Sequence, residues 1–354
     1  QGHHFPIDDV KAGADFIRNS YPEINPSLDS RNYHILRNKL HNAQLVFERE
    51  KKGRVAFLGG SITYNGGWRD SICNYLQKRF PNTKFEFIAA GIPSMGSTPG
   101  AFRLERDVLS KGKVDLLFED AAVNDRANNF SPEAQIMGME GIVRHALTSN
   151  PAMDIVIMHF VDPDKMADYR KGIIPVEIQN HEKVAAHYGI STINLAKEVT
   201  ERIDNGESTW ENDFKNLHPS PFGQHIYFQS VKTFMETCWG GFVADDDKLT
   251  SYPLPSKINN ASYDNGILIP AVQVNTVKGW KVDQNWTPTD KTGTRDDFTK
   301  VPMLIAEAPG EPLKFDFDGN AVGIAVASGF DAGIVEYRID RKSTRLNSSH
   351  ITIS

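Results

Sequence analysis

Three polar residues follow apolar stretches far apart in the sequence and together could perform acyl transfer. Ser61 comes after the apolar run 55–58 and two glycines, Asn124 follows a second apolar run, and His218 precedes a proline far downstream. A serine hydroxyl becomes a useful nucleophile when an imidazole removes its proton. Amide donors stabilise the oxyanion that forms on the attacked carbonyl. We therefore predict that Ser61 is the nucleophile, His218 the general base and Asn124 an oxyanion donor.

The chain around these residues alternates between short apolar runs and stretches of helical period. Continuous apolar runs at 55–58, 85–89, 114–118, 155–160 and 191–195 are typical of buried parallel strands, and helices are expected at 133–149 and 171–187. This βαβα order predicts an α/β fold with a doubly wound parallel sheet. Such sheets bind ligands outside the carboxyl ends of their strands, where Ser61 and Asn124 are expected.

Changes in pattern divide the chain into four segments. Residues 1–50 are expected to be helical or irregular, and residues 51–245 to form the α/β domain. Turn formers and period-2 patterns over 251–340 predict an accessory β-sandwich, with one strand at Leu313, Phe315 and Phe317 and another at Val322, Ile324 and Val326. Residues 341–354 lack this pattern, so we expect an exposed or irregular, non-native tail that leaves the sandwich truncated with an unpaired edge.

Composition excludes several classes of function. The 354 residues are 40% hydrophobic and 24% charged, with a net charge of -6 and no basic stripe, so nucleic acid is not an expected partner. No apolar run approaches the roughly 20 residues that a membrane span needs. The start at Gln1 suits a mature form whose export signal has been removed, or a fragment. We expect a periplasmic or secreted protein, and its oligomeric state stays open.

Four segments resemble, in order, the blocks of the SGNH (GDSL-type) hydrolase family. They are Phe-Leu-Gly-Gly-Ser-Ile-Thr at 57–63, the glycine block at 89–97, Ala-Val-Asn-Asp at 122–125 and Leu-His-Pro at 217–219. Gly replaces the usual Asp before the serine, and Ala replaces the usual Gly in the third block. The resemblance covers about half of the chain and implies a flavodoxin-like sheet and serine hydrolase chemistry with no cofactor and no metal.

The resemblance also implies three oxyanion donors. These are the Ser61 amide, an amide of the glycine block and the Asn124 side chain. The glycine block has an extra residue here, so its donor is Gly96 or Ser94, with a slight preference for Gly96.

The acid member is where the sequence departs from the family. The family places Asp three residues before the histidine, and this chain has Lys215 there. Asp213 is the predicted third member, if a shifted loop lets it orient the imidazole. The alternative is a Ser61–His218 dyad supported by a backbone carbonyl. Trp68 and Arg69 could contact substrate, although a tryptophan at a helix start is more often part of the core.

The predicted function is a serine esterase that removes small acyl groups, most plausibly acetyl, from carbohydrate. The substrate class follows from resemblance to SGNH esterases with an accessory β-domain. A catalytically degenerate carbohydrate-binding protein is one alternative, and a lipase or thioesterase of the same fold is another. His181 and His187 do not have the spacing of a zinc-binding helix.

Overall fold

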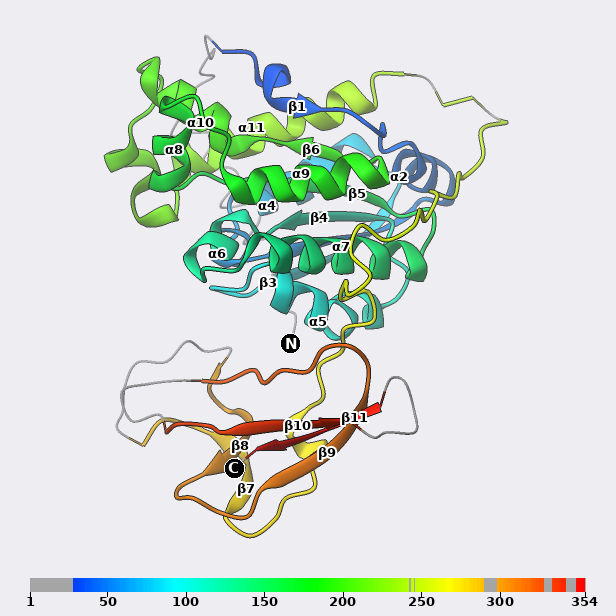
Figure 1. The fold of residues 1–354 in the computed structure, drawn as a ribbon. Coiled ribbons are helices and arrows are strands. Elements are labelled where there is room, and N and C mark those ends of the chain that lie inside the picture. Colours follow the sequence, from blue (N-terminus) through cyan, green and yellow to red (C-terminus); the bar gives the residue numbers. More distant parts are fainter. Residues whose placement is uncertain are drawn as a thin grey trace. The chain divides into compact units, whose positions relative to one another are not determined.

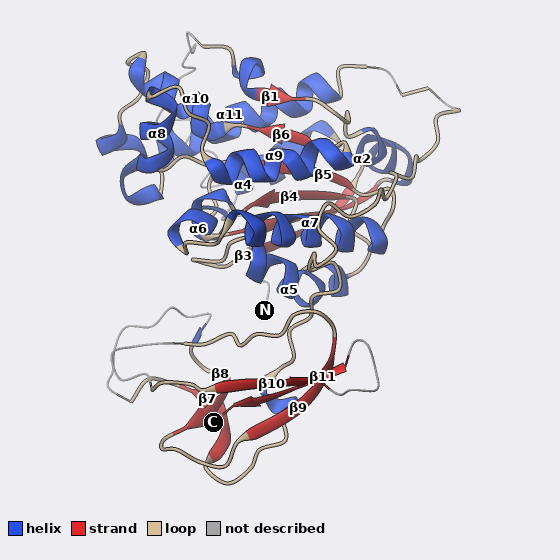
Figure 2. Cartoon of the chain, in the orientation of Figure 1, coloured by secondary structure: helices blue, strands red, loops and turns tan. Residues whose placement is uncertain are grey.

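The computed structural model describes residues 28–241, 243–244, 246–289, 298–327, 333–341 and 348–353. The chain divides into two units, Gln1–Ile267 and Leu268–Ser354, and each is described by itself. The first unit contains a six-stranded sheet in the order β1-β6-β5-β4-β2-β3, in which only β1 is antiparallel to its neighbour (Figure 2). Its strands are β1 (His34–Ile35), β2 (Lys52–Gly59), β3 (Lys84–Gly91), β4 (Leu116–Asp120), β5 (Asp154–Met158) and β6 (Ser191–Ile193).

The five parallel strands have the flavodoxin-like order, which confirms the predicted fold class. From β2, the next strand in the chain, β3, lies on one side, and β4 lies on the other side. The strand order therefore reverses between β2 and β4. Each predicted strand is present with ends shifted by a few residues. The helix expected at 171–187 begins only at Val176, because Gly172 takes a left-handed conformation with φ 72° and Pro175 precedes the helix.

Helices cover both faces of the sheet (Figure 1). Val55 and Phe57 of β2 face one core, formed with α4, α10 and α11, while Ala56 and Leu58 face a second core, formed with α5, α7 and α9. This alternation explains why residues 55–58 of the strand are all apolar. The helices and helical turns of the unit are η1 (Ser30–Tyr33), α2 (His41–Leu45), η2 (Val46–Glu50), α3 (Ser61–Tyr64), α4 (Trp68–Arg79), α5 (Ser97–Asp107), η3 (Leu109–Lys111), α6 (Ala122–Ala127), α7 (Pro132–Ser149), α8 (Pro163–Arg170), α9 (Val176–Tyr188), α10 (Leu195–Asp204), η4 (Trp210–Phe214), η5 (Lys215–Leu217) and α11 (Pro221–Cys238). No helix among the described residues is long and apolar enough to cross a membrane.

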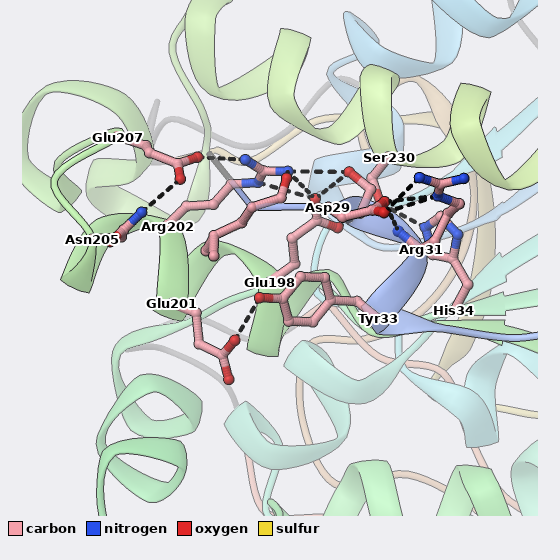
Figure 3. A network of polar contacts seen from close by, with 12 residues as sticks. Asp29, Arg31, Tyr33, His34, Glu198, Glu201, Arg202, Asn205, Glu207 and Ser230 are labelled. Carbon is pink, nitrogen blue, oxygen red and sulfur yellow. Dashed lines mark hydrogen bonds and ion pairs between the residues drawn. The ribbon is translucent and has the colours of Figure 1, made fainter. Parts of the chain in front are cut away.

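A buried polar network fixes the described start of the chain to α10 and α11 (Figure 3). The fully buried Glu198 carboxylate accepts hydrogen bonds from Ser30 Oγ at 2.6 Å and from Ser230 Oγ at 2.5 Å. Arg202 donates to the same carboxylate at 2.8 Å and to the carbonyl of Leu28 at 3.0 Å. The buried carboxylate of Glu198 therefore has hydrogen-bond donors from three residues, as burial requires. Residues 1–27 of the predicted N-terminal segment lie outside the described residues.

Residues 250–266 pack along the first unit, although the predicted β-domain begins at 251. The buried Glu140 carboxylate of α7 accepts hydrogen bonds from the amides of Ile258 (2.6 Å) and Asn259 (3.0 Å), and the Tyr252 hydroxyl donates to Asp154. The division between the two units accordingly falls at Ile267 and Leu268.

The second unit has a turn η6 (Ala271–Gln273) and two antiparallel sheets, β7 (Trp280–Trp286) with β8 (Val301–Ala306), and β10 (Tyr337–Arg341)-β11 (Ser348–Ile353)-β9 (Leu313–Asp318). Buried Leu313 packs with Trp280 and Leu304 of the other sheet. The strand predicted around Val322, Ile324 and Val326 is absent, since residues 321–327 pair with no strand. The expectation of an irregular tail is also wrong for residues 348–353, which form β11 between β9 and β10. Residues 342–347 and 354 of that tail lie outside the described residues.

Candidate active site

Ser61 lies at the reversal point of the sheet, at the end of β2. The strand ends at Gly59, and α3 begins at Ser61, whose side chain is half-buried. A Cβ on Gly59 would come 1.9 Å from Asp120 Oδ2, and one on Gly60 would come 1.9 Å from Asn124 Nδ2. The two glycines therefore provide the space in which the polar end of β4 and the start of α6 approach the serine.

Asp120 fixes the turn that presents Ser61. Its buried carboxylate accepts hydrogen bonds from the Thr63 hydroxyl and the Gly60 amide. Burial raises the pKa of Asp120 to about 6, and these hydrogen bonds act in the opposite direction. From the other side, Arg69 Nη1 donates to the Thr63 carbonyl at 2.7 Å. The turn is thus held by side chains from β4 and α4.

The positions of Trp68 and Arg69 correct the prediction that they contact substrate. Trp68 is 0% exposed and packs at 5.7 Å from Phe57 and 5.4 Å from Phe160, measured between ring centroids. Arg69 is 3% exposed, and its guanidinium is engaged by Thr63 and Asp70. Both residues support the site from the core, because helix α4 turns its first residues toward the sheet.

Three candidate oxyanion donors lie in this region. Asn124 on α6 presents its amide at Gly60, and Ser61 is the first residue of α3, where a backbone N–H has no helical acceptor. Gly96 is buried just before α5, beside Asp125. Within the described residues, the Gly96 amide has no hydrogen-bond acceptor. Ser94 instead lies exposed in a turn with φ 66°, and its carbonyl accepts a hydrogen bond from Asn128.

Asp125 and His181 form a buried pair behind the glycine block, which sequence reasoning did not find. Both side chains are 0% exposed, and His181 Nε2 lies 2.9 Å from Asp125 Oδ2. Asp125 also accepts hydrogen bonds from the Ser97 amide and the Ser97 hydroxyl, each at 2.7 Å. The only sequence signal was that Asp125 follows Asn124, and His181 had been considered only as a metal ligand.

His218 lies in the loop between η5 and α11. Ser220 Oγ accepts from the Gly223 amide at 3.3 Å and caps the N-terminus of α11. Gln224, on the first turn of that helix, accepts a hydrogen bond from the Trp68 amide at 3.0 Å. This contact joins the first turn of α11 to the start of α4. The His218 side chain is exposed, and no hydrogen bond joins it to Ser61 among the described residues.

Asp213 is placed near this loop but has other partners. Its carboxylate accepts from the Thr209 amide at 2.8 Å and contacts Ser220 Oγ at 3.4 Å. No hydrogen bond to His218 is present in the part of the chain that the structure describes. Lys215, at the family's usual Asp position, is exposed and lies 3.6 Å from Glu211. Asp213 therefore stabilises the loop by contacting residues on both sides of it, Thr209 and Ser220.

The described residues include no group of three or more His, Cys, Asp and Glu side chains placed to hold a metal ion. The candidate site thus contains a half-buried serine and an asparagine amide beside Gly60, and the candidate imidazole lies exposed in the loop before α11. This set of groups can perform nucleophilic acyl transfer.

Comparison with known proteins identifies a family and similar folds. Residues 57–226 match the model of the GDSL-like Lipase/Acylhydrolase family. The chain is similar to two crystal structures of a two-domain esterase (CEX) active on acetylated mannans, one co-crystallised with mannopentaose, at 20% and 19% identity and a TM-score of 0.66, with 92% of each chain covered. A variant of Axe2, an acetyl xylan esterase from Geobacillus stearothermophilus, matches 52% of this chain and 96% of its own at 16% identity and a TM-score of 0.42. No curated protein matches the sequence. The likeness to the two-domain esterase shows the fold.

Proposed function

The α/β unit of this chain belongs to the GDSL-like Lipase/Acylhydrolase family, and we propose that the protein is a serine esterase that removes acetyl or similarly small acyl groups from carbohydrate. One observation supports this most strongly. Ser61 follows β2, and the Asn124 amide follows the neighbouring strand β4 and lies against Gly60, at the point where strand order reverses. Nucleophile and donor are therefore held together by the sheet rather than by a flexible loop.

In the proposed mechanism, Ser61 Oγ attacks the acyl carbonyl carbon while His218 accepts the serine proton. The tetrahedral oxyanion receives hydrogen bonds from the Ser61 amide, the Gly96 amide and Asn124 Nδ2. Collapse breaks the bond between the acyl carbon and the sugar oxygen, to which His218 returns the proton. Water then attacks the acyl-enzyme with His218 as base, releasing the acid and restoring Ser61.

Gly96 rather than Ser94 is proposed as the donor from the glycine block. Gly96 is buried beside Asp125, next to Asn124, and its amide is unpaired within the described residues. Ser94 is exposed at a turn. A donor must be preorganised to stabilise developing charge, and Gly96 lies in the more tightly packed position.

Asp213 is proposed to act on His218 through the loop. By accepting the Thr209 amide and contacting Ser220, its carboxylate fixes both ends of the segment that presents the imidazole. In this proposal the catalytic pair is a Ser61–His218 dyad. Asp213 stabilises the loop that carries His218 and does not contact the imidazole directly, as the acid of a standard triad would.

The proposed substrate class is acetylated polysaccharide, by analogy with the two-domain esterase active on acetylated mannans. Since such substrates lie outside cells, we also propose a periplasmic or secreted location. A catalytically degenerate carbohydrate-binding protein is the second candidate, because His218 is exposed and has no hydrogen bond to Ser61 within the described residues.

Acetate release from acetylated mannan and xylan oligosaccharides tests the proposal. The wild type should release acetate and Ser61→Ala should not, while both should bind the deacetylated oligosaccharide alike. Binding without release by the wild type would favour the degenerate protein. A preference for p-nitrophenyl octanoate over the acetate ester would favour a lipase or thioesterase.

A further inference from the structure

The buried pair Asp125–His181 is a polar cluster beside the candidate oxyanion donors that the mechanism above does not use. Asp125 follows Asn124 on α6, so one short helix holds both an oxyanion donor and this carboxylate. His181 comes from α9, 56 residues further along the chain. The pair therefore links the site to a helix that packs on the second face of the sheet.

Asp125 directly contacts the glycine block. Its two oxygens accept the Ser97 amide and hydroxyl, each at 2.7 Å, and a Cβ on Gly96 would come 2.2 Å from Asp125 Oδ1. On its other side the block packs against Gly138 of α7, where a Cβ would come 2.6 Å from Ser97 Oγ. Gly96 and Ser97 are thus confined between α6 and α7.

Stability does not account for such a pair. Removing a carboxylate and an imidazole from water has a large desolvation cost, and well-packed apolar residues often stabilise a core equally well or better. The Asp125 carboxylate already accepts two hydrogen bonds from Ser97, and His181 Nε2 donates a third. The three hydrogen bonds together restrict the glycine block to one conformation.

We propose that Asp125 and His181 are positioning residues for the oxyanion hole: Asp125 fixes the Gly96 amide through Ser97, and His181 fixes Asp125. This inference rests on the proposed esterase function and adds two residues to it. Neither residue touches the substrate.

The test compares the steady-state kinetics of acetyl ester hydrolysis in Asp125→Asn, His181→Leu and His181→Gln. Asp125→Asn and His181→Leu should lower kcat about 10- to 100-fold, since small displacements of catalytic groups have effects of this size. KM should stay within about threefold, because an oxyanion donor acts on the transition state rather than on bound substrate. His181→Gln, which keeps a donor near the Nε2 position, should retain more activity than His181→Leu.

Two further variants separate positioning from folding. Glu198→Gln alters an equally buried carboxylate in the network of Figure 3 and should leave kcat unchanged, whatever its effect on the melting temperature. Ser97→Ala should reduce kcat only severalfold, because the Ser97 amide still donates to Asp125. It also provides a test if Asp125→Asn fails to fold.

The outcomes are distinguishable from failure of the proposed function. If wild type and Ser61→Ala hydrolyse the ester equally slowly, the esterase proposal fails. If the wild type is active and the folded Asp125 and His181 variants keep its kcat, or change only KM, the positioning role is overturned and the esterase stands.

Discussion

The side-chain amide of Asn124 lies against the backbone of Gly60. A Cβ at Gly60 would come 1.9 Å from Asn124 Nδ2, closer than real atoms approach. The φ of Gly60 is -89°, which any residue can adopt, so glycine is required here by space and not by backbone conformation. This contact fixes the spacing between the nucleophile and a proposed oxyanion donor.

Gly60→Ala should therefore displace Asn124 and lower kcat by about 10²-fold, the effect expected of a misplaced catalytic group. Steady-state hydrolysis of p-nitrophenyl acetate measures it. Gly241→Ala is the matched control, because no heavy atom lies within 4 Å of a Cβ there. A Gly60→Ala enzyme as active as the control would show that Asn124 is not held by this contact.

Asn124→Ala should lower kcat by about 10²- to 10³-fold, as loss of an oxyanion donor does elsewhere. Its side chain makes no hydrogen bond among the described residues, so thermal stability should change little. Activity and melting temperature measured on the same preparation check both expectations. A large loss of stability with an unchanged kcat would assign Asn124 a structural role instead.

The loop of His218 gives a graded prediction. His218→Ala removes the base and should lower kcat by about 10²- to 10⁴-fold. Asp213→Asn weakens the contacts of this side chain with Thr209 and Ser220 and should lower kcat less, about tenfold. Lys215→Ala breaks only an exposed ion pair with Glu211, which is worth little, and should stay within about twofold.

Equal losses from Asp213→Asn and His218→Ala would contradict this order. That result would show that Asp213 contacts the imidazole directly during catalysis.

The sequence was sufficient for the strands, and the structure places Ser61 and Asn124 at the strand ends where they were predicted, while their catalytic roles and that of His218 stay predictions. Buried parallel strands are continuous apolar runs, and a serine or asparagine at the end of such a run has a defined place at the sheet edge. Local patterns cannot show which residues distant in sequence meet. The Asp125–His181 pair joins positions 56 residues apart, and although Asp125 belongs to the block at 122–125, nothing in its neighbourhood identifies His181 as its partner.

Two other failures have specific causes. The position of Trp68 at an expected helix start left both substrate contact and the core open, and it lies in the core. Residues 321–327 alternate between apolar and other residues as a strand does, yet alternation forms a strand only where another strand offers hydrogen bonds.

Asp120 predicts a pH dependence of stability. Burial raises its pKa from 3.8 to about 6, so between these values the native state binds a proton that the unfolded chain has released. The free energy of unfolding should therefore fall as pH rises from about 4 to about 6 and then level off. At 1.36 kcal/mol per pKa unit, the contribution is about 3 kcal/mol.

The side chain introduced by Asp120→Asn does not titrate, so the variant should lack this pH-dependent contribution to the free energy of unfolding. Urea unfolding at a series of pH values should thus show the variant gaining about 3 kcal/mol relative to wild type between pH 4 and pH 7. If the unfolding free energies of the two proteins changed in parallel with pH, the pKa of Asp120 would not be raised in the folded protein.

The most direct test of the account is covalent labelling of Ser61 by a fluorophosphonate. Attack by an activated serine forms an Oγ–P bond and expels fluoride, so it requires both the nucleophile and the base but no particular sugar. Mass spectrometry of the intact protein and its peptides should show one adduct, on Ser61, absent from Ser61→Ala and formed far more slowly by His218→Ala. An unlabelled wild-type protein, or an adduct that persists in Ser61→Ala, would contradict the claim that Ser61 is the nucleophile of a serine esterase.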